Sequence, residues 1–151
     1  MSTDTPRPPD TVFADTNLFL RYLTNDVPEQ AGAVEQCLRR AAAGQLHLVT
    51  NGLVMAEIVW TLQSFYRLGR TDIKEKVVAI VNTAGLEVTE GDLVLQAISD
   101  YVEHNVDFID AYNAAWMRHR GLTRVYTFDR RHFSRMDGVT VLCPGEEQKA
   151  L

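Results

Sequence analysis

Four acidic residues stand at positions where a carboxylate could do chemistry: Asp15, Glu57, Asp110 and Asp129. Asp15 directly follows the apolar run 12–14 and is followed in turn by a hydroxyl and an amide side chain. Such a run predicts a central parallel strand that is buried on both faces. Ligands of open α/β sheets bind beyond the carboxyl ends of these strands, so Asp15 is a candidate site residue. A helix cap or an Asx-turn is the alternative role for this aspartate.

Glu57 lies in a sequence that predicts a helix. Its helical neighbours three and four positions away are mostly apolar: Leu53, Val54, Trp60 and Thr61. An acid on a buried apolar face loses several kcal/mol of hydration free energy unless a cation pairs with it, and no Lys or Arg lies within one turn. Glu57 is therefore either a functional carboxylate or a residue at the margin of the buried stripe that reaches water.

Asp110 is three positions after Asp107, the spacing of a capping box at the start of a helix. In that interpretation both acids only satisfy the helix N-terminus. In the functional alternative, the positive end of the helix keeps Asp110 ionised and directed at the strand ends.

Asp129 closes a short strand-like segment that contains Thr127, and so repeats the arrangement at Asp15. We expect both acids at the same edge of a parallel sheet. The alternative for Asp129 is an N-cap of the turn that follows.

Carboxylates that gather at one place raise one another's pKa values unless a cation neutralises them. Oxygen ligands of this kind suit the hard ions Mg²⁺ and Mn²⁺. The sequence lacks the Cys/His spacing that a zinc site needs.

Basic residues are concentrated near the fourth acid. The segment 118–135 contains Arg118, His119, Arg120, Arg124, Arg130, Arg131, His132 and Arg135, with Tyr126, Phe128 and Phe133 among them. Basic and aromatic side chains together favour contact with single-stranded nucleic acid. We expect Arg130 and Arg131 to contact phosphates, whereas Arg118 and Arg120 also fit a solvated helix end.

Alternating strand and helix patterns predict β-α-β units and a mainly parallel sheet with helices on both faces. The expected strands cover residues 12–14, 47–50, 86–89, 125–128 and 139–142. The expected helices cover residues 18–23, 29–43, 51–68, 71–84, 92–104 and 108–119.

The 151 residues suit a single domain over residues 11–151, after a proline-rich lead-in, residues 1–10, that is expected to be disordered. No apolar run is long enough to span a membrane, and the two cysteines are too few for a disulfide framework, so we expect a cytoplasmic protein. The formal net charge of −5 argues against a generally basic nucleic-acid binder.

The set Asp15-Thr16-Asn17, Ala56-Glu57, Asp110-Ala111 and Thr127-x-Asp129 resembles the PIN domain, and most closely the VapC-type ribonuclease toxins of toxin–antitoxin pairs. The resemblance covers residues 12 to 143. It implies an α/β fold of the PIN type, a three-layer α/β/α sandwich with a five-stranded mainly parallel sheet. It also implies a Mg²⁺- or Mn²⁺-dependent endoribonuclease in which Asp15, Glu57, Asp110 and Asp129 are the catalytic and metal-binding residues, with Asn17 and Thr127 in support.

The same resemblance implies three partners: an RNA substrate, a cognate antitoxin protein and a second copy of the chain in a homodimer. The chain departs from the family pattern in its lead-in. It also has the bulky Tyr112 and the polar Asn113 where smaller or apolar residues are expected.

Several other functions stay open at this point. One is a PIN nuclease of RNA processing that is not a toxin, and another is a binding module that kept the fold without activity. A third is a different metal-dependent phosphoryl hydrolase with Asp15 as nucleophile. Asn17 counts against this last function because it occupies the place of the second acid that such enzymes need.

Overall fold

Strands and helices alternate along the chain, as the sequence predicts. The structure, a computed structural model, describes residues 10–145. The lead-in expected to be disordered therefore lies outside the described residues, except for Asp10, which is already in the first strand. The strands are β1 (Asp10–Phe13), β2 (Leu46–Thr50), β3 (Leu86–Val88), β4 (Arg124–Tyr126) and β5 (Thr140–Leu142). The helices are α1 (Thr16–Thr24), α2 (Pro28–Ala42), α3 (Gly52–Ser64), α4 (Arg70–Val81), α5 (Gly91–Glu103), α6 (Phe108–His119) and the short 3₁₀ helix η1 (Phe133–Arg135).

The strands form two parallel sheets rather than one. β2 is central in a sheet of order β1-β2-β3, and β4 pairs only with β5. In the first sheet Phe13 is in register with Val49, and Thr50 with Val88. The α/β class with parallel strands is confirmed, whereas the single five-stranded sheet is not.

β1 is an edge strand and not the buried central strand that its apolar sequence predicts. All four of its residues are exposed, and Val12 and Phe13 keep 45% and 56% of their surface. The reason is that β1 has only β2 beside it, so its outer edge has no partner strand among residues 10–145.

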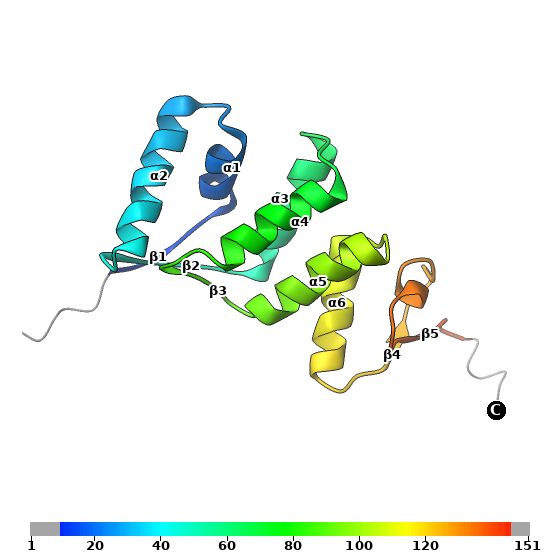
Figure 1. Cartoon of the computed structure of the whole chain (residues 1–151). Helices are drawn as coiled ribbons and strands as arrows, with labels where there is room; N and C mark the ends of the chain where they lie inside the picture. The colour runs from blue at the N-terminus through cyan, green and yellow to red at the C-terminus, as the bar shows by residue number, and fades with distance from the viewer. Residues whose placement is uncertain (1–9, 146–151) are drawn as a thin grey trace, which may run out of the picture.

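The β4–β5 pair lies at the other end of the molecule, beyond α6 (Figure 1). Hydrogen bonds from arginines tie this end to the helices that precede it. Arg118 donates to the carbonyl of Asp137 at 3.0 Å, and Arg135 donates to the carbonyl of Asn105 at 2.7 Å. The short connection from α6 to β4 and these bonds together hold the pair beside α6, away from β1.

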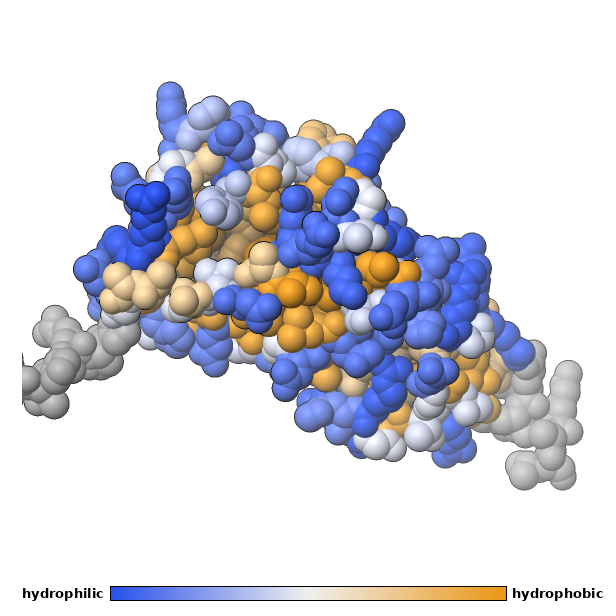
Figure 2. All heavy atoms as spheres, viewed as in Figure 1, coloured by the Kyte–Doolittle hydropathy of each residue, from blue (hydrophilic) through white to orange (hydrophobic). Residues whose placement is uncertain are grey.

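An apolar hollow of about 270 Å³ separates the α1–α2 hairpin from α4, with Phe19, Leu23, Leu38 and Ile80 among its lining residues. Figure 2 shows hydrophobic surface in this area between α2 and α4. Within residues 10–145 the helices are all too short or too polar to cross a membrane.

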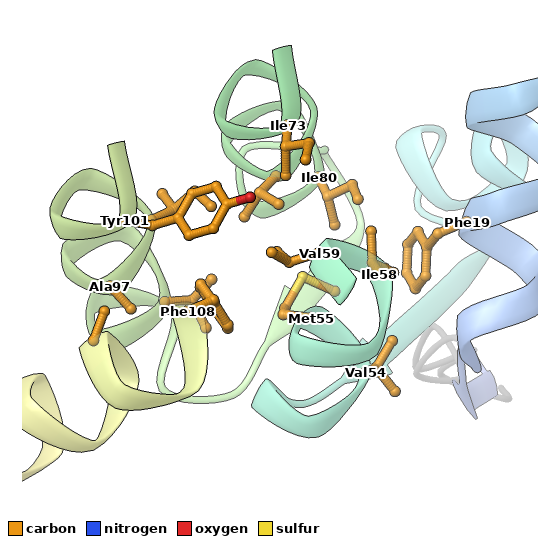
Figure 3. Packing of buried hydrophobic residues seen from close by; sticks show 14 of the residues in the cluster. Phe19, Val54, Met55, Ile58, Val59, Ile73, Ile80, Ala97, Tyr101 and Phe108 are labelled. Carbon is orange, nitrogen blue, oxygen red and sulfur yellow. The ribbon is translucent and has the colours of Figure 1, made fainter. Parts of the chain in front are cut away.

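The hydrophobic core is centred on α3, which is surrounded by α1, α4, α5 and α6 (Figure 3). Met55, Ile58 and Leu62 on α3 are fully buried, and Ile73 of α4 and Tyr101 of α5 pack into the same cluster. The opposite face of α3 carries Leu53, Glu57 and Trp60 and is exposed. The core therefore fixes which side of α3 faces solvent.

Arg70, the first residue of α4, joins three parts of this core. Its guanidinium donates to the carbonyls of Tyr101 at 2.7 Å and Val106 at 2.8 Å. It also lies 4.1 Å from the centre of the Tyr101 ring, a cation–π contact. These contacts fix the start of α6, and with it the position of Asp110.

Candidate functional site

The first carboxylate pair joins α1 to α3. Asp15 is the exposed N-cap residue of α1, and its side chain makes no capping hydrogen bond. The next residue, the buried Thr16, donates from Oγ1 to Oε2 of Glu57 at 2.9 Å. Asp15 and Glu57 are thus brought to the same place through Thr16, with Asn17 exposed beside them.

Glu57 is exposed, so the alternative in which this acid reaches water is confirmed. Two of its apolar neighbours are exposed as well, since Leu53 keeps 82% and Trp60 65% of their surface, whereas Val54 is buried. The apolar pattern around Glu57 is therefore divided, with Leu53 and Trp60 on the surface of α3 and Val54 in the core.

Hydrogen bonds join the carboxyl ends of β1, β2 and β3 in the first sheet. Thr50 at the end of β2 donates to the carbonyl of Ala14 at 2.9 Å, and Thr89 after β3 donates through its backbone to the carbonyl of Thr50 at 3.0 Å. The residues that follow these three, Asp15, Asn51 and Glu90, therefore stand along one edge of the sheet.

The second carboxylate pair lies between α6 and the segment after β4. Oδ2 of Asp110 is 3.1 Å from Nδ1 of His132, and the backbone nitrogen of Asp107 is 3.3 Å from the same ring nitrogen. Asp107 is the N-cap residue of α6 but makes no side-chain capping bond, so the capping-box interpretation is wrong. In a capping box, the Asp110 carboxylate would accept a hydrogen bond from the backbone N–H of Asp107. In this structure Nδ1 of His132 lies beside that N–H instead.

The pKa of Asp110 lies above its usual value of 3.8. Partial burial is the main cause, because it disfavours the charged form; the hydrogen bond and charge of His132 oppose it, and the charges of Asp107 and Asp129 add to it. Burial thus opposes the stabilisation of the ionised form that the helix N-terminus was expected to give.

Asp129 caps the turn that follows β4, as its alternative role predicted. Its Oδ1 accepts a hydrogen bond from the backbone of Arg131 at 3.1 Å, and its own N–H donates to Oγ1 of Thr127 at 3.1 Å. Thr127 thus helps to hold Asp129 in this turn.

The four acids do not gather at one place. Among residues 10–145, no three His, Cys, Asp or Glu side chains lie close enough together to hold a metal ion. Asp15 and Glu57 belong to the first sheet and α3, whereas Asp110 and Asp129 belong to α6 and the end of β4. The expectation that Asp15 and Asp129 share a sheet edge is wrong, because β4 is not in the sheet of β1. The donor chemistry suits Mg²⁺ or Mn²⁺, but this arrangement does not complete a site.

A match to a family model nevertheless decides the family. A model of the PIN domain matches residues 12–139, a range that contains all four carboxylates. The chain belongs to the PIN domain family. It is similar to a protein named VapC ribonuclease from Aquifex aeolicus (strain VF5), with 27% identity over 133 residues that make up 88% of this chain and 96% of that protein.

Among solved structures, the chain is similar to the crystal structure of VapC20 from Mycobacterium tuberculosis, described there as a sarcin–ricin loop cleaving toxin. The two sequences are 24% identical, the likeness covers 78% of this chain and 88% of that one, and the TM-score is 0.35.

The basic segment of this PIN domain divides into structural and exposed arginines. Arg118 pairs with the buried Asp100 at 3.0 Å, and Arg120 lies 4.0 Å from the centre of the Trp116 ring. Arg130 and Arg131 are exposed directly after Asp129. His132 is the residue that sequence reasoning missed: it was counted only as part of the basic segment. Its position three residues after Asp129 in a turn was the only signal of its role.

Proposed function

We propose that this PIN domain is an endoribonuclease that cleaves RNA phosphodiester bonds with the help of Mg²⁺ or Mn²⁺, and that it is the toxin of a VapBC-type toxin–antitoxin pair. One observation carries the proposal. The likeness to a protein named VapC ribonuclease extends over 96% of that protein, and the PIN match contains all four acids.

In this proposal Asp15, Glu57, Asp110 and Asp129 together bind the divalent ion, with Asn17 and Thr127 in support. Since the acids form two pairs in this structure, the proposal requires the pairs to approach when the ion and the RNA bind. Strand β1 supports this requirement. Its outer edge leaves backbone groups available for pairing, and its exposed side chains Val12 and Phe13 are available for packing.

Arg130 and Arg131 contact phosphates of the RNA in this proposal. Both are exposed beside Asp129, and the overall charge of −5 makes a local cationic surface necessary for a polyanion. The protein acts in the cytoplasm with a cognate antitoxin and as a homodimer. Exposed aromatic side chains support such protein partners, since Trp60 keeps 65% and Phe65 73% of their surface.

The test is cleavage of a single-stranded RNA by the purified full chain with Mg²⁺ or Mn²⁺, and its loss on adding a chelator. Asp15→Asn is expected to abolish cleavage in a folded protein. Asp72→Asn, the same change at an exposed position on α4, is the matched control and should cleave like the wild type. Cleavage that persists in chelator, or in folded Asp15→Asn, would overturn the proposal.

A further inference from the structure

A pocket of about 350 Å³ opens between the start of α3, the loop after β3 and one face of α6. Its lining residues are Asn51, Gly52, Leu53, Ala56, Thr89, Glu90, Ile109, Tyr112 and Asn113. The volume lies at the small end of the range of ligand sites, roughly 300–1,000 Å³. Tyr112 and Asn113 are also the two residues that depart from the family pattern.

We propose that this pocket binds one unpaired RNA base next to the scissile phosphate, and that Glu90, Tyr112 and Asn113 select the base. The inference rests on the proposed ribonuclease function for the identity of the ligand. It goes beyond that function by assigning a specificity pocket to the chain.

Tyr112 forms the platform of the pocket. A Cβ atom on Gly52 would meet the Tyr112 ring at 3.1 Å, so the ring packs directly on the backbone at the start of α3. The Tyr112 hydroxyl donates to Oε2 of Glu90 at 2.6 Å, which holds the ring in place. Unpaired RNA bases are recognised by stacking on such fixed aromatic rings.

Glu90 is held at the pocket in an unfavourable backbone conformation. Its φ angle is +57°, in the left-handed region that residues other than glycine rarely adopt. Strain of this kind persists where surrounding contacts fix it, and it is concentrated at functional sites. Here the hydrogen bond from Tyr112 is the contact that fixes the carboxylate.

The charges of the pocket favour a base over a phosphate. Within the described part of the chain, the lining includes one carboxylate and two carboxamides but no Lys or Arg. A carboxylate repels phosphate, whereas it accepts hydrogen bonds from the amino group of a base. The apolar walls, Leu53 and Ile109, are exposed by 82% and 53% and suit the faces of a planar ring.

The position of the pocket connects it with the proposed catalytic residues. Asn51 and Glu90 stand on the same sheet edge as Asp15, because Ala14, Thr50 and Thr89 are joined by hydrogen bonds. Asp110 lies on α6 between Ile109 and Tyr112 of the pocket. A strand of RNA at the carboxylates therefore has an adjacent nucleotide beside the pocket.

Glu90 accepts hydrogen bonds and cannot donate them, so the pocket favours bases that carry an exocyclic amino group: adenine, cytosine and guanine. Uracil offers a single donor at this edge, N3–H, which lies between two carbonyl oxygens that a carboxylate repels, so uracil is disfavoured. Glu90→Gln adds an N–H donor while keeping an acceptor for Tyr112, so it should reduce the discrimination against uracil.

Binding is measured without divalent metal in the Asp15→Asn background, with single-stranded RNA decamers that carry one fluorescent 2-aminopurine in a uridine sequence. We expect quenching on binding. Tyr112→Leu and Ile109→Ala should each weaken binding by about tenfold, the typical effect of losing one stacked base. Tyr22→Ala, which removes an exposed aromatic on α1 outside the pocket lining, is the control and should bind normally. Ile109→Ala keeps the test valid if Tyr112→Leu does not fold.

Unchanged RNA binding in folded Ile109→Ala would overturn the proposal that the pocket binds a base, whether or not the wild type cleaves RNA. It would point to a protein contact at this pocket instead. Unlabelled decamers with uracil or adenine at the probe position are compared as competitors of the 2-aminopurine decamer, and equal competition with Glu90 present would overturn the assigned base preference. Weakened binding in the pocket variants, together with a wild type that never cleaves, would support the pocket and refute the nuclease proposal. The two proposals therefore fail independently.

Discussion

Exposure separates the four carboxylates at the scale of single residues. Asp15, Glu57 and Asp129 are exposed, whereas Asp110 is partly buried against His132. The sequence left two roles open for Glu57, a functional carboxylate or a residue at the margin of the buried stripe that reaches water. It could not decide between them because an apolar helix pattern does not say which of its faces packs against the core; Leu53 and Trp60 turn out to be on the solvent side.

Asp107→Asn and Asp110→Asn distinguish a capping role from a functional one. Since the Asp107 side chain makes no capping bond and Asn caps equally well, Asp107→Asn should cost at most a few tenths of a kcal/mol and leave cleavage intact. Asp110→Asn keeps a polar partner for His132 but removes a charged oxygen ligand, so cleavage should fall by about a hundredfold or more. RNA cleavage by the two variants at matched stability is the measurement. An inactive Asp107→Asn beside an active Asp110→Asn would place the third acid one turn earlier.

Tyr101→Phe tests the electrostatics of the core. Tyr101 is fully buried and donates to Gln63 at 3.0 Å. Burial raises its pKa above 10.0, opposed by Arg70 and assisted by Asp107. A raised pKa means that the stability from the neutral phenol is fully present below pH 10.0 and is lost as the pH rises through the folded-state pKa. Tyr101→Phe should therefore cost about 1 kcal/mol at pH 7, the value of one hydrogen bond.

The difference in unfolding free energy between the wild type and Tyr101→Phe should shrink at alkaline pH, because only the wild type must then bury or expose a phenolate. Urea denaturation of the wild type and of Tyr101→Phe, from pH 7 upwards, measures this difference. A difference that stays constant beyond pH 10.0 would contradict the assigned cause.

At the scale of elements, the ranges of helices and strands were both predictable, but the pairing of the strands was not. α6 occupies 108–119, the predicted range, because its apolar spacing and the Gly121 that follows it are local signals. α3 ends at Ser64 rather than at 68, since the chain turns into a left-handed residue at Arg67 that no glycine or proline announces. β4 and β5 have only three residues each, too few for a period-2 pattern to report their partners.

Two glycines that precede strands form a matched pair. Gly44 and Gly85 both have a φ angle of +78°. A Cβ atom at Gly85 would lie 2.1 Å from the carbonyl oxygen of Ala41, whereas nothing lies within 4 Å of one at Gly44. Gly44→Ala should therefore cost about 1 kcal/mol of unfolding free energy from backbone strain alone. Gly85→Ala should cost about 3 kcal/mol or more, because the overlap adds to the strain. Equal losses in chemical denaturation would refute the close approach of α2 to β3.

At the scale of the whole molecule, the sequence predicted the family and the α/β class but not the separation of the strands into two sheets. Strand sequences indicate that a residue is extended, while the choice of neighbour depends on long-range contacts. Arg118 and Arg135 hold the β4–β5 end on the α5–α6 side through backbone carbonyls, and no local pattern encodes such bonds. The candidate site is divided for the same reason, because Asp15 follows a strand of the first sheet and Asp129 follows a strand of the second.

The division of the acids makes the response to metal a test of the whole molecule. If the proposed ion binds all four carboxylates, Mn²⁺ should stabilise the wild type by roughly 2.7 kcal/mol at a hundredfold excess over Kd. The melting temperature of a domain of this size should then rise by about 5–10 °C. Asp15→Asn and Asp129→Asn, one change in each pair, should each remove most of this rise. Mn²⁺ should also slow hydrogen exchange of the β1 amides, since the proposed approach of the two pairs brings the β4 end of the chain to the exposed strand β1. A rise that Asp129→Asn removes and Asp15→Asn leaves intact, with β1 exchanging as before, would mean that the ion binds only the α6 pair.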